Sequence, residues 1–369
     1  MRVPVLGLVV LMAAGCGAAA PSQAEEDATV KVGAIISQTG VYAPLGEDME
    51  TAMRLYLDEN GGRLGGRPAS LVVADDAGNP EKGRQRAREL IAEDRVDVIT
   101  GLIASPVAVS VADEAAGTPV VIANAGADQL GGRGVFRVSY TNRAHGYAAG
   151  RYAAERFAGQ AVVLMASDYS AGQQTLDGFE QGYGEKAVKR ILTPFGQGVD
   201  LAPYMARIPA EAELVYAFYA GGEADAFLRA YRQHGYQDKI TLLACGNLTD
   251  EDVARRVGAD ADGIVAIGPY SPALDNPDNA AFVATWRART GRNPSMVAAQ
   301  SWDAMRLIDR AVAKGGDLTG ALGRVTELPS PRGTVTFDET HHNPVQNWYA
   351  TLHQNGVNRV IATIPPEVG

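Results

Sequence analysis

Apolar runs rich in Val, Ile and Leu alternate with helical patterns from Thr29 onward, and this alternation constrains the fold more than any other feature. Strands that are so continuously apolar are buried on both faces, which is typical of parallel sheets joined by crossover helices. The pattern runs once and then repeats, and the chain closes with further strand-like segments. We therefore expect an α/β protein with two sheet units in tandem, whose last segments return to an earlier sheet.

The period of the apolar residues places the individual elements. Strands are predicted at 30–36, 70–74, 96–100, 119–123, 161–166, 188–194, 213–218, 240–245, 263–267, 333–337, 346–352 and 357–364. Helices are predicted at 47–60, 81–93, 106–116, 143–157, 171–183, 223–234, 250–257, 280–290 and 296–314.

Residues 1–15 have the features of an export signal. Arg2 precedes an apolar run that is too short to span a bilayer stably. The string Ala13-Ala14-Gly15-Cys16 is similar to the bacterial lipobox, in which the cysteine is diacylated and becomes the new N-terminus. We therefore expect lipidation of Cys16 and a membrane tether over residues 16–27, which are small, polar and acidic. An ordinary signal peptide that is cleaved near residues 18–20 is the alternative.

The composition excludes several classes of protein. Of the 369 residues, 46% are apolar and 21% are charged, which excludes disorder for most of the chain. The 43 acidic residues outnumber the 33 Lys and Arg residues, whereas a nucleic-acid partner requires a basic surface. We therefore expect no nucleic-acid partner.

The motifs of common α/β enzymes are missing from the sequence. The loop from Ser37 to Tyr42 contains neither glycine-rich phosphate motif, and the chain has no G-x-S-x-G elbow. The pair His341–His342 has no nearby cysteine and no H-E-x-x-H spacing. We therefore expect no metal, no cofactor and no enzymatic activity, and together with the export signal this favours binding.

Two loops at the predicted carboxyl edge of the first sheet could receive a ligand. In the first, Ser105 is placed to cap a helix whose first turn contains Pro106. Its hydroxyl and the free backbone N–H groups attract an anion such as a carboxylate, although a plain helix cap is the alternative. The second loop, 124–128, has small residues that let a ligand approach the backbone, and a turn without function is the alternative. Ligands of open α/β sheets bind at this edge.

Aromatic residues occur in the loops that follow several predicted strands. They could enclose an apolar or aromatic ligand from two sides while their hydroxyl groups fix its polar end. Each of them could instead serve packing alone. These residues are Tyr42, Tyr169, Tyr219 and Tyr270.

The order of short strings along the chain resembles the periplasmic substrate-binding proteins of ABC importers. It is most similar to the type I branch typified by the leucine/isoleucine/valine-binding protein, from about residue 30 to residue 364. The strings are Gly33-Ala34-Ile35-Ile36-Ser37, Thr39-Gly40, Gly46, Asn60-Gly61-Gly62, Gly65-Gly66-Arg67, Asp75-Asp76, Asn79-Pro80, Tyr270-Ser271-Pro272-Ala273-Leu274-Asp275-Asn276-Pro277, Pro331-Arg332-Gly333 and His342-Asn343-Pro344-Val345-Gln346.

This resemblance implies two Rossmann-like lobes joined by three crossovers, which close on a ligand by hinge motion. Lobe 1 would comprise residues 28–139 and 271–331, and lobe 2 would comprise residues 140–270 and 332–369. The tandem halves that the pattern indicates would then be interrupted domains.

The resemblance also implies a set of ligand-binding residues. Ser105 corresponds to the serine that binds the ligand carboxylate, Gly126 and Ala127 to neighbouring backbone contacts, and Tyr169 to an aromatic lid. Two family tyrosines correspond to Leu45 and to Ala220 or Gly221. The complete set expected at the site is Tyr42, Leu45, Ala104, Ser105, Gly126, Ala127, Tyr169, Tyr219, Gly221, Asn247 and Tyr270.

One departure from the family pattern concerns the ligand's charge. Amino-acid binders hold the ammonium group with a glutamate, and at that position this chain has Gly246, with Asn247 beside it. Asp168 or Glu223 could substitute, because a buried ammonium group without a charge partner is costly. The resemblance leaves both an amino acid and an aromatic or other organic acid open as ligands.

We therefore expect an exported solute receptor, anchored in the membrane by its lipid, that delivers a small carboxylate to an ABC importer permease. The alternative is a sensor protein of the same fold that signals the presence of the solute.

Overall fold

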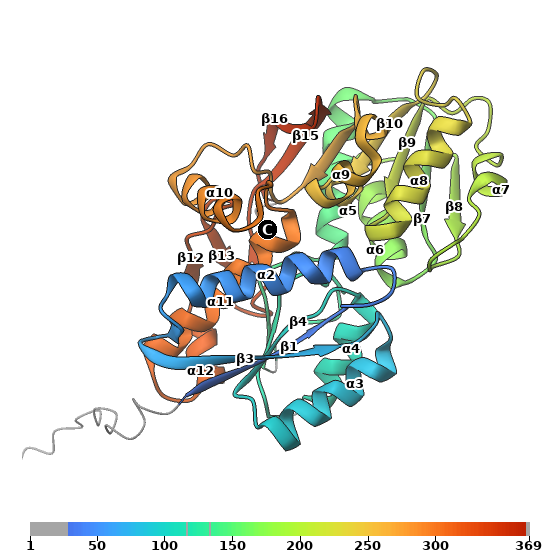
Figure 1. Cartoon of the computed structure of the whole chain (residues 1–369). Helices are drawn as coiled ribbons and strands as arrows, with labels where there is room; N and C mark the ends of the chain where they lie inside the picture. Colours follow the sequence, from blue (N-terminus) through green and yellow to red (C-terminus); the bar gives the residue numbers. More distant parts are fainter. Residues whose placement is uncertain (1–28, 116, 133, 367–369) are drawn as a thin grey trace, which may run out of the picture.

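The computed structural model describes residues 29–115, 117–132 and 134–366, which form two α/β lobes and a small additional sheet (Figure 1). The predicted signal peptide, the tether and Cys16 lie outside the described residues. Within the described part of the chain, no helix combines the length and the apolarity that a membrane crossing needs.

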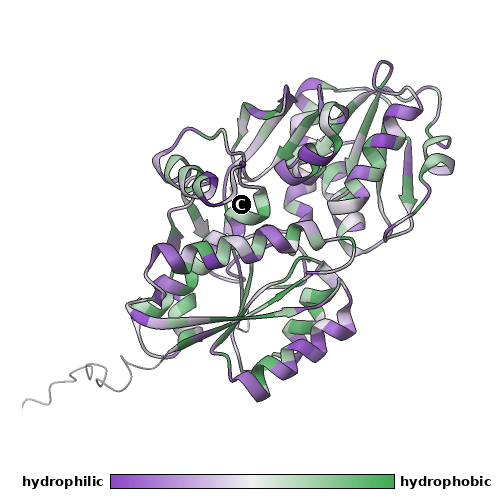
Figure 2. Cartoon of the chain, in the orientation of Figure 1, coloured by the Kyte–Doolittle hydropathy of each residue, from purple (hydrophilic) through white to green (hydrophobic). Residues whose placement is uncertain are grey.

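Lobe 1 is built on a sheet with the strand order β2-β3-β1-β4-β5-β6. All neighbouring pairs are parallel except β2–β3. Apolar residues line the strands, whereas the outward turns of helix α3 are hydrophilic (Figure 2). The strands are β1 Val30–Ile36, β2 Arg63–Leu64, β3 Arg67–Asp75, β4 Val98–Gly101, β5 Val120–Ile122 and β6 Val135–Arg137. The helices are α2 Ala43–Glu59, α3 Pro80–Glu89 with a π-turn at Leu90–Asp94, α4 Ser105–Glu114, α10 Pro277–Thr290, α11 Met296–Lys314 and α12 Leu318–Gly323.

Lobe 2 is built on a sheet with the strand order β16-β15-β11-β10-β9-β7-β8. Strands β7 to β11 are parallel to one another. Strand β15 pairs with β11 in the antiparallel direction, and β16 pairs with β15 in the antiparallel direction. The strands are β7 Val162–Ser167, β8 Lys189–Thr193, β9 Leu214–Phe218, β10 Thr241–Cys245, β11 Val265–Gly268, β15 Trp348–Gln354 and β16 Val357–Ile364. The helices are α5 Asn142–Arg156, α6 Ser170–Tyr183, α7 Ala202–Met205, α8 Gly221–Gln233 and α9 Glu251–Val257, with 3₁₀ turns at Gly246–Leu248 and Gly258–Ala261.

The small sheet consists of β12 Glu327–Leu328, β13 Val335–Phe337 and β14 Pro344–Val345. It contacts lobe 1, because the ring of His342 packs edge-on against Phe136, 4.9 Å away between centroids, and Gly132 N–H donates to the His341 carbonyl. The lobe boundary expected between residues 331 and 332 falls inside this sheet. The lobe limits remain a prediction, and we propose that lobe 1 continues through Val345.

Strand β6 has no counterpart among the predicted elements. It is short and contains a charged residue, Arg137, whose side chain is buried. The guanidinium group donates to the carbonyl oxygens of Tyr140 and Ala127, both at 2.9 Å, and to that of Leu130. These bonds hold the chain where it leaves lobe 1, and burial lowers the pKa of Arg137 to about 10.

Helices α5 and α6 pack closely because glycines line their interface. A Cβ atom at Gly146 would overlap the Thr175 carbonyl oxygen, and one at Gly150 would overlap that of Phe179. On the facing helix, Gly178 and Gly182 lie equally close to backbone atoms of α5. The glycines at this spacing let the two backbones touch, at the cost of lower helix propensity.

A buried arginine joins the segments that cross between the lobes. Arg332 pairs with Asp303, and both side chains are completely buried. Its guanidinium group also donates to the Val138 carbonyl at 2.7 Å and to the side-chain oxygen of Gln346. Gln346 in turn donates to the Ser139 carbonyl at 2.9 Å. This network fixes the first and third crossovers to each other and to lobe 1.

Candidate functional site

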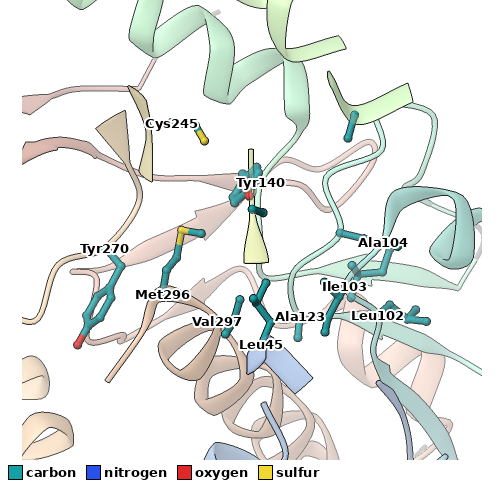
Figure 3. Close-up of a cluster of buried hydrophobic side chains, with 14 of the residues drawn as sticks. Leu45, Leu102, Ile103, Ala104, Ala123, Tyr140, Cys245, Tyr270, Met296 and Val297 are labelled. Atoms are coloured by element: carbon teal, nitrogen blue, oxygen red, sulfur yellow. The ribbon is translucent and has the colours of Figure 1, made fainter. Parts of the chain in front are cut away.

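A cavity lies between the two lobes at the carboxyl ends of the parallel strands. Its free volume is about 20 Å³, which is room for about one water molecule. Figure 3 shows Leu45, Ile103 and Tyr140 from its wall among neighbouring buried apolar side chains such as Met296. The lining residues are Tyr42, Leu45, Ile103, Ser105, Asn124 and Gly126 from lobe 1, Tyr140 from the first crossover, and Asn142, Tyr169, Ala171, Phe218, Ala220 and Asn247 from lobe 2.

The lobes touch each other around this cavity. Gly222 N–H of lobe 2 donates to the Val41 carbonyl of lobe 1 at 3.2 Å. Met296 N–H of lobe 1 donates to both carboxylate oxygens of Asp250 at 2.9 and 3.0 Å. Because a cavity of about 150 Å³ is needed to hold a benzene ring, the lobes must move apart to admit a ligand of that size.

Ser105 lines the cavity, but it does not cap helix α4 as predicted. The N-cap residue is Ala104, with extended backbone angles, and Ser105 is the first helical residue. The tight turn before it places Gly101 and Leu102 at positive φ, and a Cβ atom at Gly101 would overlap the Ile35 carbonyl oxygen. The Ser105 hydroxyl is therefore not engaged in capping and accepts a hydrogen bond from Asn142 at 3.3 Å.

Gly126 is placed against Asn142 at the start of α5. Asn142 N–H donates to the Gly126 carbonyl at 2.6 Å, and a Cβ atom at Gly126 would overlap the Asn142 side-chain oxygen. The Asn142 amide also donates to Gln174 of α6 at 2.9 Å. A side chain at this position would displace the Asn142 amide, which is held between the hydroxyl of Ser105 and Gln174.

Helix N-termini at the cavity differ in their caps: α5, which begins with Asn142, is capped by Thr141, whereas α4, α6 and α8 begin there without a side-chain cap. Helix α2 also lacks a side-chain cap, but the N–H groups of Ala43 and Leu45 in its first turn donate to the carbonyl oxygens of Gly40 and Tyr42. The other described α-helices of six or more residues, α3, α9, α10, α11 and α12, are each capped by a side chain. The uncapped N-termini leave N–H donors and positive dipole ends at the cavity, which favours an anion there.

Two tyrosines meet across the mouth of the cavity. The hydroxyl groups of Tyr42 and Tyr169 lie 3.2 Å apart, so one donates to the other. Phe195 packs against both rings, with centroid distances of 5.9 Å to Tyr42 and 4.8 Å to Tyr169. Burial raises the pKa of both tyrosines, so that both remain neutral hydrogen-bonding groups.

Five of the predicted site residues do not line the cavity. Ala104 and Ala127 are buried behind it. Tyr219 points into the lobe 2 core, where it stacks on Phe227 at 4.7 Å, and the Tyr270 hydroxyl donates to Asn279 at 3.0 Å. Gly221 lies at the contact between the lobes, where a Cβ atom would be 2.6 Å from the Val41 oxygen.

No aspartate or glutamate lines the cavity in the described part of the chain. A side chain at Gly246 would meet the backbone of β11, since its Cβ atom would be 2.9 Å from the Gly268 Cα. Glu223 lines an adjoining pocket beside Tyr219 and accepts a hydrogen bond from Gly196 N–H at 2.9 Å; burial raises its pKa to about 7. Asp168 is exposed and binds Gln173.

Sequence reasoning missed several lining residues. Tyr140 and Asn142 follow strand β6, which was not predicted, so no strand end pointed to them. Asn124 belongs to the loop that was singled out, and Ala220 was one of the two alternatives given for a family tyrosine. The others adjoin predicted positions: Ile103, Ala171 and Phe218. These residues lie at or after predicted strand ends, and that pattern was the sequence signal for them. A strand end does not indicate which of the adjacent residues in the loop faces the cavity.

The chain matches known proteins along most of its length. A family profile described as periplasmic binding protein matches residues 29–356. Leu/Ile/Val-binding protein homolog 6 of Brucella abortus (strain 2308) is 29% identical over 339 residues, which cover 87% of this chain and 86% of that protein.

Solved structures match both lobes. A solute-binding protein of an ABC transporter from R. palustris, in complex with benzoate, is 33% identical with a TM-score of 0.86, and the match covers 92% of this chain and 98% of that one. A solute-binding protein from Rhodopseudomonas palustris BisB5, in complex with 3,4-dihydroxy benzoic acid, is 28% identical with a TM-score of 0.85 and the same coverage of 92% and 98%.

These matches confirm the expected resemblance and the two-lobed α/β fold. The profile extends over both lobes and their crossovers, as far as the turn between β15 and β16. The chain belongs to the periplasmic binding protein family, in its type I form.

Proposed function

We propose that this protein is an exported solute receptor of an ABC importer whose ligand is a small carboxylate with an aromatic or apolar body. The observation that carries the proposal is the convergence of three uncapped helix N-termini, those of α4, α6 and α8, on the cavity between the lobes. Their free N–H groups and the Ser105 hydroxyl suit a carboxylate, which accepts several hydrogen bonds at once. Tyr42, Tyr169 and Phe218 provide aromatic surface for the rest of the ligand.

The missing ammonium partner favours an aromatic or other organic acid over an amino acid. A buried ammonium group without a carboxylate is costly, and the described cavity wall has none. The benzoate complex of the R. palustris protein, at 33% identity, points in the same direction. An amino acid is the second candidate, supported by the name of the Brucella relative.

Ligand capture would proceed by closure of the lobes. Ser105 and Gly126 belong to one side of the cavity and Tyr169 and Asn247 to the other, so a ligand between them joins the lobes. The closed receptor would then deliver its ligand to a membrane permease. Export by the N-terminal signal and anchoring through Cys16 are part of the same proposal.

A thermal-shift screen tests the ligand class. The purified protein is heated with each of the twenty amino acids, with benzoate, hydroxybenzoates and cinnamates, and with short aliphatic acids. A ligand at about 100 times its Kd stabilises the folded chain by about 2.7 kcal/mol, which raises the Tm measurably. We expect shifts with the aromatic acids. A shift with amino acids alone would replace the aromatic-acid assignment, and no shift with any carboxylate would contradict the proposal.

The variant Ser105→Ala tests the carboxylate site. Loss of one hydrogen bond to a charged group should weaken a carboxylate ligand by about 1–3 kcal/mol, measured as Kd by isothermal titration calorimetry. The matched control is Ser110→Ala, which removes a hydroxyl from the same helix away from the cavity. Equal affinity of the two variants would remove Ser105 from the ligand site.

A further inference from the structure

A second cavity lies behind the first, on the hinge side of Tyr140. Its volume is about 220 Å³, and Tyr140 is the one residue that lines both cavities. A cavity of roughly 150 Å³ suffices to bind benzene, so this one has room for a single aromatic ring in the conformation described. Its walls come from α5, from the third crossover near β14, and from β15 and the end of β16.

Helix α5 presents one face to this hinge cavity. Thr141, Ala144, Ala148 and Arg151 are three or four residues apart and therefore lie on the same side of the helix. The alanines leave space, and Arg151 places a guanidinium group at the wall. Among the described residues, Arg151 has neither an ion pair nor a hydrogen-bond partner, although the chain carries a net charge of −10.

The opposite wall is aromatic. The ring of Trp348 stacks on the ring of His145, with 5.1 Å between the ring centroids and 15° between the ring planes. Its centroid lies 5.7 Å from that of Tyr140. Asn343 lines the cavity from the turn before β14, and its side-chain oxygen has no hydrogen-bond partner in the described structure. Because this oxygen is buried, it does not face the free space of the cavity, and the rings of Trp348 and Tyr140 are what this wall presents to a ligand.

We propose that the hinge cavity is a second binding site, for a small aromatic carboxylate. The carboxylate pairs with Arg151, and the ring packs against Trp348 and Tyr140. A ligand here contacts both lobe 2 and the third crossover, so its binding affects the hinge. The inference does not depend on the ligand of the cavity between the lobes, because the two cavities share only Tyr140.

The test uses 4-hydroxybenzoate as the probe and Trp348 as the reporter. The chain has three tryptophans, so protein labelled with 5-fluorotryptophan gives three fluorine resonances, and Trp348→Phe identifies the one at the hinge. We expect that resonance to move on titration, and equilibrium dialysis to count two probe molecules per chain.

Two variants on α5 locate the site. Arg151→Gln should weaken the hinge site about tenfold, because it removes the partner of the carboxylate at a partly exposed position. Arg156→Gln is the matched control, since Arg156 lies on the same helix, stacks on Tyr152 and does not line the cavity. Both variants should melt close to the parent temperature.

The outcomes separate this site from the cavity between the lobes. If the cavity between the lobes binds no aromatic acid, dialysis should still count one molecule of 4-hydroxybenzoate per chain, bound at the hinge cavity. The affinity of that molecule should depend on Arg151 but not on Ser105. A Trp348 resonance that stays fixed, or that moves at the same probe concentration in Arg151→Gln as in the parent, overturns the proposal. So does a single bound molecule whose affinity changes only in Ser105→Ala.

Discussion

Asn247 is the residue at which the charge preference of the cavity can be tested directly. It lies next to the position of the family glutamate, it lines the cavity, and its side-chain oxygen lies 3.5 Å from the Tyr140 hydroxyl. Asn247→Asp keeps the size of the side chain and adds a negative charge. We expect it to weaken binding of an aromatic carboxylate at least tenfold, or about 1.4 kcal/mol, through like-charge repulsion in a buried site.

Calorimetric titration of the variant with benzoate and with phenylalanine measures this change. Gain of phenylalanine binding would mean that the added carboxylate serves as the missing ammonium partner. Asn247→Ser, which stays neutral, is the control for lost contacts. An aspartate variant that binds benzoate as tightly as the parent would place Asn247 away from the ligand.

His145 makes the stability of the protein depend on pH. Its ring is buried on α5, where it stacks on Trp348 and one nitrogen, Nε2, donates to the Ile267 carbonyl at 2.7 Å. Burial disfavours the charged ring and lowers the pKa of His145 to about 4. The unfolded chain, with an ordinary histidine pKa near 6.5, therefore binds the proton first. Stability should fall as the pH drops from about 6.5 to about 4, by about 3 kcal/mol in total.

His145→Gln isolates this contribution, because glutamine can still donate to Ile267. Urea unfolding at several pH values between 4 and 7 should show a smaller loss toward acid in the variant than in the parent. The comparison is needed because burial raises the pKa of Glu223 to about 7, and that group destabilises the fold as the pH rises. Parallel curves for parent and variant would contradict the prediction.

At this scale the sequence predicted positions better than side-chain directions. Ser105, Gly126, Tyr42 and Tyr169 line the cavity as expected, because each follows a strand of a parallel sheet and all such strand ends meet at one edge. Tyr219 also follows a strand but turns into the core, onto Phe227. A strand end determines where a residue lies, whereas the direction of its ring depends on packing partners far away in the sequence. Whether these residues bind the ligand stays a prediction.

Among the elements, the pair α5–α6 is the one whose packing depends most on glycine. Gly146→Ala would place a methyl group on the Thr175 carbonyl oxygen, which cannot move without shifting α6. We expect a loss of about 3 kcal/mol in the free energy of unfolding, measured with urea, despite the higher helix propensity of alanine.

Gly323→Ala serves as the matched control for this change. Gly323 ends helix α12, and its Cβ atom would meet only a Phe136 side-chain carbon at 3.9 Å. This variant should be as stable as the parent or slightly more stable. If Gly146→Ala were equally stable, the close approach of the two helices would not be required.

The long elements were predictable from periodicity, whereas most strands of two or three residues were not. β1, α11 and β16 have the predicted ends, because their apolar pattern is continuous and bounded by turn residues. The unpredicted β2, β6, β12 and β14 have two or three residues, too few to show a period. Helix α4 begins one residue before its predicted start, since Ala104 adopts the cap conformation and Ser105 joins the first turn.

For the whole molecule, the buried pair Arg332–Asp303 is expected to hold the hinge together. Arg332→Met would leave the Asp303 carboxylate buried without its partner and would free the Val138 carbonyl. We expect a loss of about 3–5 kcal/mol in the free energy of unfolding. The double variant with Asp303→Leu should be less destabilised than the single one, because no uncompensated charge remains. Equal or greater loss in the double variant would assign the effect to packing.

The two-lobed plan followed partly from periodicity and partly from resemblance. Alternating strands and helices were enough to predict two parallel sheets, and the β-rich end was enough to predict a return to one of them. The antiparallel direction of β15 and β16 does not follow from their apolar pattern. The small sheet was also missed, because its strands are short and pair across turns that cross the expected lobe boundary.

The return of β15 to the edge of β11 has a consequence for how the protein is made. Ribosomes release the chain from its N-terminus, so β11 emerges long before its neighbour, which begins at Trp348. Until then that sheet ends in an unpaired strand that can pair with other chains. The nascent protein therefore has an aggregation-prone edge until nearly all of it has been synthesised, and a holding chaperone that covers this edge would protect it during export.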